Sequence, residues 1–325
     1  MDENLSKIRS FLKEDLDKYK TTLNKTLSSN VFLVDNISKY IVKHKGKGLR
    51  PLLVLLSARL LGVPNEKTYL VATIVELLHT ATLIHDDVVD EAVVRRSFPS
   101  INAIWKNKIS VLMGDYLLAK SLISATETEN MEIMNMLANT AKRLSQGELF
   151  QIEKSRKLDI TEEEYLNMIS DKTAALISAC CGLGAMTVSD NVEDKISLQK
   201  YGENIGIAFQ IKDDLLDYQG DQRTIGKPVG ADLREKKITL PLILSFKNSP
   251  TQEKRFILKL IKKGVTNKDV KRIFEFIHTY GGLVSAQKYS LSYAENAKQN
   301  LATIQDGPAK EKAYNFVDYI INRKK

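Results

Sequence analysis

The chain has 325 residues, of which 43% are hydrophobic and 27% are charged, and its formal net charge is +8. These values are typical of a soluble globular protein, and lysines spread along the whole chain argue against a nucleic-acid-binding role. The sequence has no run of about 18 consecutive apolar residues and no apolar segment behind its first methionine, so neither a transmembrane span nor a signal peptide is predicted.

A long amphipathic helix is predicted over residues 1–28. Apolar side chains from Leu5 to Leu27 recur at steps of three and four residues, with lysines and acids between them. We expect this helix to pack on the body of the protein or on a second subunit. A membrane-surface helix is the alternative, and the acids on the polar face argue against it.

Residues 31–44 predict a second helix, which leads into a short, positively charged loop. Gly46 and Gly48 break the helix there and leave backbone amides free. Lys47 and Arg50 add two cations to the same segment. Cations beside free amides are suited to binding an anion.

The most informative helix is predicted from about residue 67 to residue 91. It is apolar on most sides, which is typical of a helix in the middle of a bundle, yet it ends in Asp86, Asp87 and Asp90. His79 shares one face with Asp86 and Asp90, because these positions are seven and four residues apart.

A helix predicted at about 192–219 repeats the same spacing in Asp213, Asp214 and Asp217. Carboxylates one turn apart can bind one hard cation, and Mg²⁺ is usually held by one or two carboxylates together with phosphate oxygens. A bound metal would also remove the cost of placing acids at the C-terminal end of an apolar helix. We therefore expect the two acidic runs to face each other and to hold divalent metal between them.

Two adjacent cysteines, Cys180 and Cys181, are the only ones in the chain. Neighbours on a helix point about 100° apart, which disfavours a disulfide between them. They are typical of small buried residues in a reducing compartment, so we expect a cytoplasmic protein.

The remaining pattern is helical as well, with no convincing strand, linker or repeat. We interpret the chain as all-α, one domain over residues 1–325, built as a helical bundle around a deep central cavity. Further helices are predicted at 52–61, 108–125, 129–155, 162–187, 238–248, 251–263, 267–280, 282–304 and 308–323.

Cations flank both acidic runs. Guanidinium groups bind phosphate through two parallel hydrogen bonds, and lysine acts as a point charge. Carboxylates and cations around one cleft suggest one diphosphate bridged by metal and another bound directly, and hence two substrates. The flanking cations are Lys47, Arg50, Arg95, Arg96 and Lys227.

Three segments resemble the trans-polyprenyl diphosphate synthase family. They are residues 84–90 with the arginines at 95 and 96, residues 210–218, and residues 226–233. The resemblance extends from about residue 30 to the C-terminus and is strongest to long-chain members of the octaprenyl type. It implies an isoprenoid-synthase bundle, usually a homodimer, with about three Mg²⁺ ions per active site, which Mn²⁺ can replace.

The resemblance also implies roles for individual residues. Isopentenyl diphosphate would be bound by Lys47, Arg50, His79 and Arg96. Metal would be bound by Asp86, Asp90 and Asp213, supported by Asp87, Asp214 and Asp217. The allylic diphosphate and its reacting end would be bound by Arg95, Lys172, Thr173, Gln210 and Lys227, with Lys237 as a further diphosphate lysine. The residues that act directly in catalysis would be Asp86, Asp90, Asp213, Lys172 and Lys227.

In two places the chain departs from the family pattern: residues 45–48 read Lys-Gly-Lys-Gly, and Lys236 replaces the usual glycine.

The expected reaction needs no side-chain nucleophile or general base. Metal and cations stabilise the departing diphosphate of the allylic substrate, the double bond of isopentenyl diphosphate attacks the resulting cation, and a proton is lost, most simply to the released diphosphate. His85 touches the first acidic run, and we expect it to serve packing or to support the ligands from behind.

Product length is expected to depend on the space below the first aspartates. Ala81 and Thr82 precede Asp86 by five and four residues, and a facing helix contributes Ser121, Ser124 and Ala125. All five side chains are small, so we predict a deep tunnel and a product of roughly six to ten isoprene units (about C30–C50), with eight preferred, for quinone side chains.

Three alternatives to this enzyme are considered. A class I terpene cyclase would not need the second substrate's Lys47, Arg50 and His79, and a head-to-head condensing enzyme resembling squalene synthase is a further possibility. The chain could also be a partner subunit of a two-component synthase that binds lipid diphosphates without turnover. Release of an oily product would involve transient contact with a membrane.

Overall fold

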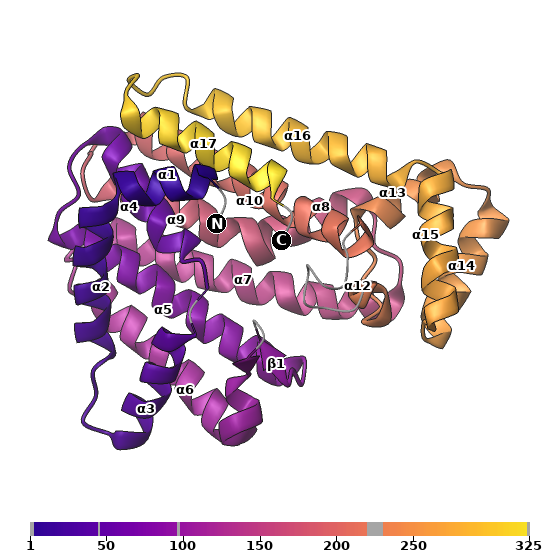
Figure 1. Ribbon diagram of the computed structural model, residues 1–325, viewed down its shortest axis with the longest axis horizontal. Helices are drawn as coiled ribbons and strands as arrows, with labels where there is room; N and C mark the ends of the chain where they lie inside the picture. Colours follow the sequence, from indigo (N-terminus) through magenta and orange to yellow (C-terminus); the bar gives the residue numbers. More distant parts are fainter. Residues whose placement is uncertain (1–2, 45, 96–97, 220–229, 324–325) are drawn as a thin grey trace.

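The computed structural model describes residues 3–44, 46–95, 98–219 and 230–323. Within these ranges the chain is helical almost throughout (Figure 1). The N-terminal part comprises α1 (Glu3–Phe11), α2 (Lys13–Leu27), α3 (Phe32–Lys43), α4 (Leu49–Leu61), α5 (Glu66–Val89), β1 (Val94–Arg95), β2 (Phe98–Pro99) and α6 (Ile101–Thr126). The middle comprises α7 (Met131–Lys157), α8 (Glu162–Ile169), the π-helical segment η1 (Ser170–Ala174), α9 (Ala175–Met186) and α10 (Val192–Gln219). The last part comprises α12 (Ala231–Arg234), α13 (Leu240–Asn248), α14 (Thr251–Lys263), α15 (Asn267–Thr279), α16 (Gly282–Asn300) and α17 (Pro308–Asn322).

The all-α prediction is confirmed, with three local corrections. The segment predicted as one helix over 1–28 is two helices that meet at Leu12, and the helix predicted over 162–187 is interrupted by η1. The expectation of no strand is wrong for a short antiparallel hairpin, in which Val94 pairs with Pro99. Strands of two residues are too short for the alternating pattern that reveals a strand in a sequence.

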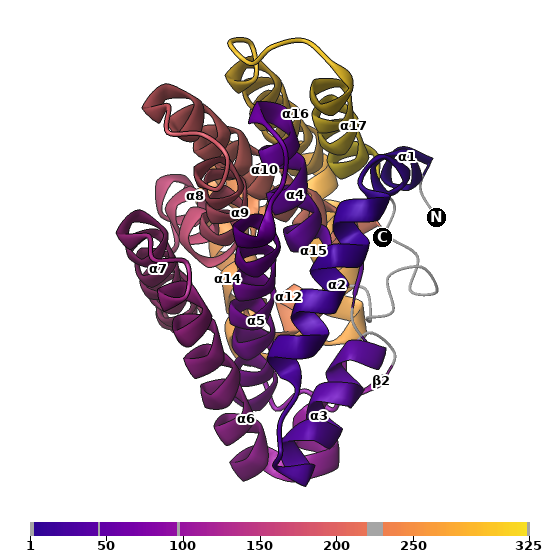
Figure 2. The ribbon, with the colours of Figure 1, turned by 90° about the vertical axis from the view of Figure 1, so that its left-hand side faces the viewer.

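The two helices that carry the acidic runs lie in the middle of the bundle. Helix α5 packs along α6 and against α4 and α9, and α10 packs against α9 and α16 (Figures 1 and 2). Helix α1 packs on α17, which brings the two ends of the chain together. The expected packing of the N-terminal helices on the body is confirmed, because their apolar residues Leu5, Ile8 and Leu12 are buried.

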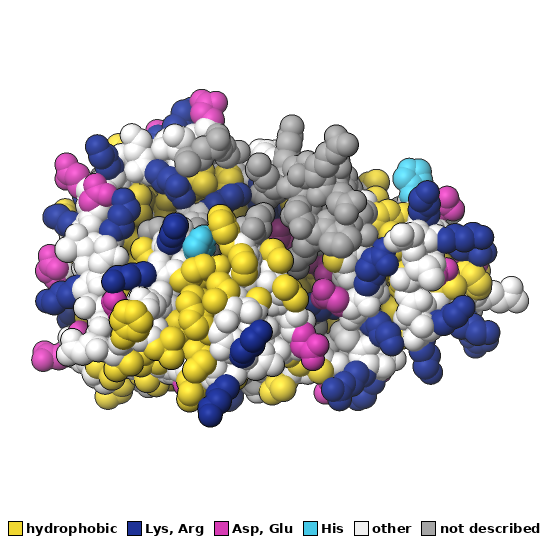
Figure 3. Space-filling model, turned by 60° about the horizontal axis from the view of Figure 1, so that its bottom comes forward, with side chains coloured by type: hydrophobic (Ala, Val, Ile, Leu, Met, Phe, Trp, Pro, Cys, Tyr) yellow, Lys and Arg dark blue, Asp and Glu magenta, His cyan; other side chains and the backbone are white. Residues whose placement is uncertain are grey.

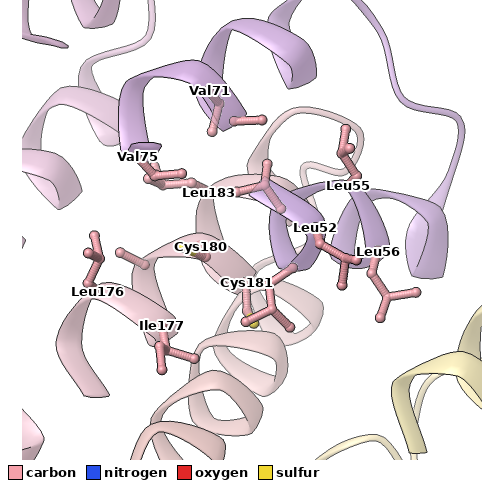
Figure 4. Packing of buried hydrophobic residues seen from close by; sticks show 14 of the residues in the cluster. Leu52, Leu55, Leu56, Val71, Val75, Leu176, Ile177, Cys180, Cys181 and Leu183 are labelled. Carbon is pink, nitrogen blue, oxygen red and sulfur yellow. The ribbon is translucent and has the colours of Figure 1, made fainter. Parts of the chain in front are cut away.

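The hydrophobic core joins α4, α5 and α9 in the first half of the bundle. Figure 4 shows Leu52 of α4 near Cys181 of α9. Both cysteines are buried and unbridged, as expected. Burial raises the pKa of the Cys181 thiol to about 12, so it stays protonated and behaves as a small apolar side chain.

Two of the described helices, α5 and α6, are long and apolar enough to cross a membrane by length and composition alone. In α5, 67% of the apolar window is buried inside the protein, as in the core helix of a globular domain, whereas in α6 only 39% is buried. Helix α6 is also broken near its start, where Lys106 has the left-handed φ of 69°. The regular part of α6 therefore corresponds to the helix predicted at 108–125.

Candidate active site

The first acidic run forms the C-terminal end of α5. The amide of Asp90 donates to the carbonyl of Asp86 at 2.8 Å, so these two side chains stand one turn apart on the helix. Asp87 points elsewhere: it is buried, and its Oδ1 accepts a hydrogen bond from Nε of Arg95 at 2.6 Å. The ion pair ties the hairpin after α5 back to the helix, so Arg95 contacts the acidic run directly.

The carboxyl of Asp86 lies in a strongly unfavourable place for a negative charge. Its pKa is raised to about 6, mainly by burial and next by the negative charge of Glu148, with Asp90 adding to the shift and Lys172 and Arg95 opposing it. Lys172 and Arg95 compensate only part of the negative charge around Asp86. A bound cation would compensate more of it.

Asp86→Asn is expected to raise the thermal midpoint of the metal-free protein at pH 7 by roughly 2–4 °C, because the wild-type carboxylate is charged there against its environment. The folded pKa is raised, so the gain shrinks as the pH falls from about 6 and vanishes below the ordinary value of 3.8, where Asp86 is protonated in both states. Thermal melts with chelator across this range check the prediction. A variant no more stable than wild type at pH 7 would contradict it.

The second acidic run lies near the end of α10, and its three acids have different surroundings. Asp214 is buried and accepts hydrogen bonds from the Tyr165 hydroxyl and from the Gln210 amide nitrogen, the latter at 2.8 Å. Asp217 accepts from the amide of Ala231 at 3.2 Å and so anchors the start of α12. Burial, followed by the charge of Asp232, raises the pKa of Asp214 well above its ordinary value.

Arg323, close to the C-terminus, reaches the same run. Its guanidinium forms an ion pair with Asp213, lies 3.7 Å from the centre of the Phe209 ring and is almost fully buried. Asp213, predicted to bind metal, is therefore paired with an arginine from the far end of the chain.

Lys172 and Thr173 lie in η1, which packs against α7 and α10. The ammonium of Lys172 is 2.5 Å from both Oε1 of Gln151 and Oε2 of Glu148 on α7. The hydroxyl of Thr173 donates to Oε1 of Gln210 at 2.8 Å, and Gln210 in turn donates to Asp214. The structure thus brings Thr173 next to Gln210, which lies 37 residues further along the chain.

A cleft connects these groups. One part is lined by Lys172, Thr173, Gln210, Asp214 and Lys237, and the adjoining part contains Asp90 and Glu148. Gln151, Ser155 and Lys237 line both parts, so Asp90 of α5 and Asp214 of α10 lie at adjoining parts of the cleft. Although burial lowers the pKa of Lys237, the charges of Glu235, Asp90 and Asp232 outweigh it and the net shift is upward. Lys237 is therefore influenced by acids on both sides of the cleft.

The residues expected to bind isopentenyl diphosphate are more dispersed. His79 lines a second pocket, between α3 and α5, together with Asp87 and Arg95. Lys47 lies near α17, where its ammonium donates to the Tyr319 hydroxyl at 3.1 Å. Arg50 is in the first turn of α4. Arg96 and Lys227 fall outside the described residues.

The small residues predicted to line a tunnel lie on α5 and α6, which pack against each other. Four of them (Ala81, Ser121, Ser124 and Ala125) are at most 3% exposed, and Thr82 is half-buried and donates to the carbonyl of His79 at 2.8 Å. The helices come close because α6 has a glycine at the contact.

This glycine of α6, Gly114, also accounts for the position of the His85 side chain. A Cβ atom at Gly114 would lie 2.2 Å from Nε2 of the His85 ring, so only glycine leaves room for the imidazole. Nε2 of His85 is 3.3 Å from the carbonyl oxygen of Val111 and 3.4 Å from Asp115. The ring is packed against α6, consistent with the expected packing role.

Sequence reasoning missed several residues that line or hold this site. Glu148 and Gln151 hold Lys172, Tyr165 holds Asp214, and Arg323 holds Asp213. Only Glu148 and Gln151 had a sequence signal: Gly147, in the middle of a long helix, directly precedes Glu148. A glycine there indicates close approach of another segment.

The residue types at the cleft fit a hard divalent cation, because carboxylate oxygens are the ligands such ions prefer. In the part of the chain that the structure describes, no three His, Cys, Asp or Glu side chains form a group that could hold a metal ion. Asp87 and Asp213 are instead paired with arginines. The raised pKa of Asp86 is the observation in favour of a cation here, since its first cause after burial is a neighbouring negative charge.

Comparison with known proteins identifies the family. Residues 32–277 match the polyprenyl synthetase family. The octaprenyl diphosphate synthase of Escherichia coli strain K12 is 32% identical over 98% of this chain and 99% of its own length. The heptaprenyl diphosphate synthase component 2 of Bacillus subtilis strain 168 is 34% identical over 97% of this chain and 90% of its own length.

Solved structures agree over nearly the whole chain. A decaprenyl diphosphate synthase from Rhodobacter capsulatus superimposes with a TM-score of 0.93 at 36% identity, covering 99% of both chains. A polyprenyl synthase from Caulobacter crescentus CB15, complexed with calcium and isoprenyl diphosphate, superimposes with a TM-score of 0.92 at 33% identity, covering 99% of this chain and 98% of that one. The all-helical fold, the two matching acidic runs and the full-length similarity lead to one conclusion: the chain belongs to the polyprenyl synthetase family and is a trans-polyprenyl diphosphate synthase, a prenyltransferase.

Proposed function

We propose that this enzyme extends an allylic diphosphate such as farnesyl diphosphate with successive molecules of isopentenyl diphosphate, and makes a polyprenyl diphosphate of about C30–C50, with octaprenyl preferred. One observation carries the proposal: acids from α5 and α10 border a single cleft that also contains Lys172 and Lys237. Similar relatives carry names from geranylgeranyl to decaprenyl diphosphate synthase, so the proposed chain length rests on the small side chains of α5 and α6. We assign the product to quinone side chains and the enzyme to the cytoplasm, with transient membrane contact when product leaves.

In this proposal Asp86, Asp90 and Asp213 bind Mg²⁺. Asp87, Asp214 and Asp217 support these three metal ligands. The residue types fit this role, and the calcium-bound Caulobacter relative supports it. When bound, the metal supplies positive charge that stabilises the departing diphosphate.

The chain's own residues supply the rest. Lys172 and Lys237 bind the allylic diphosphate, as do Arg95 and Lys227, and Thr173 and Gln210 lie beside its reacting end. Lys47, Arg50, His79 and Arg96 bind the diphosphate of isopentenyl diphosphate. The allylic C–O bond breaks and the diphosphate departs. A carbon–carbon bond forms with isopentenyl diphosphate, which then loses one proton to the released diphosphate.

One assay separates the candidate functions. Purified protein is incubated with Mg²⁺, farnesyl diphosphate and labelled isopentenyl diphosphate, and the extracted products are sized by chromatography. Label in long-chain product is expected. Cyclised product without label would indicate a terpene cyclase. Turnover only after addition of another protein would indicate a subunit of a two-component synthase, an alternative favoured by the name of the Bacillus subtilis relative.

We further propose a homodimer formed through α6. The outer side of this helix exposes Ile104, Val111, Leu112, Leu122 and Ile123, with Leu112 57% exposed. Figure 3 shows hydrophobic side chains gathered on the side of the molecule that faces the viewer. Exposed apolar side chains along one helix are typical of an interface with a second copy.

Leu112→Lys is expected to convert the dimer to monomer, because the interface would bury an unpaired charge. Light scattering after gel filtration measures the mass. Val284→Lys is the matched control: Val284 is 63% exposed on α16, so its lysine variant should remain dimeric. A wild-type protein that is monomeric at micromolar concentration would contradict the proposed interface.

A further inference from the structure

The segment that carries Lys172 and Thr173 has an unusual backbone. Ser170–Ala174 is a turn of π-helix between α8 and α9. Such turns are rare, occur often at functional sites, and persist only where their surroundings hold them. The contacts around η1 therefore determine where its two functional side chains stand.

Arg143 of α7 binds this turn directly. Its Nε donates to Oδ1 of Asp171 at 2.6 Å, and one terminal nitrogen donates to the hydroxyl of Ser170 at 2.8 Å. The same nitrogen donates to Oε1 of Glu203 on α10 at 2.9 Å, and the Ser170 hydroxyl also donates to Glu203. One guanidinium thus joins α7, η1 and α10 immediately before Lys172 and Thr173.

Two glycines bring the flanking helices close to the same turn. A Cβ atom at Gly147 would lie 2.6 Å from the amide nitrogen of Lys172, and one at Gly206 would lie 2.4 Å from Cα of Ala174. Arg143 and Gly147 are four residues apart on α7, and Glu203 and Gly206 are three apart on α10, so each helix presents one face to η1. η1 is therefore closely packed between α7 and α10, and Arg143 joins it to both helices through hydrogen bonds.

We propose that Arg143 and Glu203 are positioning residues that fix η1 and thereby place Lys172 and Thr173 against the allylic diphosphate. The inference rests on the proposed function, because it requires that these two residues act on that substrate. Glu148 and Gln151 hold only the ammonium of Lys172, whereas Arg143 holds the side chains of Ser170 and Asp171, the residues of the turn directly before Lys172 and Thr173. A shift of η1 would also move Thr173 away from Gln210.

Arg143→Lys tests the proposal because it keeps the positive charge and removes the guanidinium fork. Lysine is a point charge and cannot reproduce the fork that reaches Asp171, Ser170 and Glu203 together. We expect KM and the directly measured Kd for farnesyl diphosphate to rise by about tenfold, and KM for isopentenyl diphosphate to change by less than about twofold. Glu203→Gln, which keeps the shape of the side chain, should act in the same direction with a smaller effect.

Arg59→Lys is the matched control. Arg59 makes a two-pronged contact with buried Asp15 at 2.8 and 3.1 Å, between α4 and α2, and its described contacts include no residue of the proposed site. This variant should lower only the thermal midpoint. If Arg143→Lys behaves like Arg59→Lys, or raises both KM values equally, the positioning role is overturned.

Calorimetric titration with farnesyl diphosphate and Mg²⁺ separates this inference from the proposed function. Wild-type protein that binds farnesyl diphosphate without turnover would argue against the function, while the effect of Arg143→Lys on Kd would still decide the positioning role. Wild-type protein that neither binds nor converts it would overturn both.

Discussion

Asp86→Ala and Asp213→Ala are each expected to lower kcat by about a thousandfold or more, with a higher requirement for Mg²⁺ in whatever activity remains. Each change removes a carboxylate from one of the two helices that border the cleft, so the departing diphosphate loses part of its stabilisation. Initial rates with farnesyl diphosphate and labelled isopentenyl diphosphate, measured over a series of Mg²⁺ concentrations, check the expectation.

Loss of folding would not explain the result for Asp86→Ala, because removal of this carboxylate relieves the repulsion that raises its pKa, so the variant should melt no lower than wild type without metal. Asp213→Ala removes the carboxylate that pairs with buried Arg323, so its rate is compared at a temperature where its melt shows it folded. Asp17→Ala is the control, because Asp17 is exposed on α2 and pairs only with Lys20 at 2.7 Å among the contacts described. A near-normal rate in either active-site variant would exclude metal binding by both acidic runs.

Ala81→Phe is expected to shorten the main product to a short-chain prenyl diphosphate while the first condensations continue. Ala81 is 2% exposed on α5 and lies roughly 7.5 Å along the helix below Asp86. A phenyl ring there would close the path along which the chain grows, without touching the acids. Chromatography of the dephosphorylated products measures the shift.

Overpacking alone must be separated from this effect, since added volume in a packed core costs about 1–3 kcal/mol. Ala313→Phe introduces the same ring at a fully buried alanine of α17 and should lower the thermal midpoint while leaving product length as in wild type. Unchanged product length in Ala81→Phe would mean that the tunnel does not run past this position.

The helices were predictable because each amphipathic face repeats locally. The ends of α5 and α10 and their acidic runs followed from spacing alone, and the structure places one acid of each run, Asp90 and Asp214, at adjoining parts of one cleft. Gln210 was identified through the family resemblance of the segment that contains it. Local breaks were not predictable: η1 and the left-handed Lys106 depend on what packs against them.

The partners of the predicted residues appear only once the chain has folded. Arg143 and Glu148 are ordinary charged residues of an amphipathic helix in the linear pattern, and Arg323 resembles a charged tail. Packing of α7 against η1, and of α17 beside α10, turns them into neighbours of Lys172 and Asp213. Side-chain periodicity reports which face of a helix is apolar, but contacts between distant helices depend on how those faces dock. The acidic runs can thus be found in the residue order, whereas the groups that hold and neutralise them are decided by long-range packing.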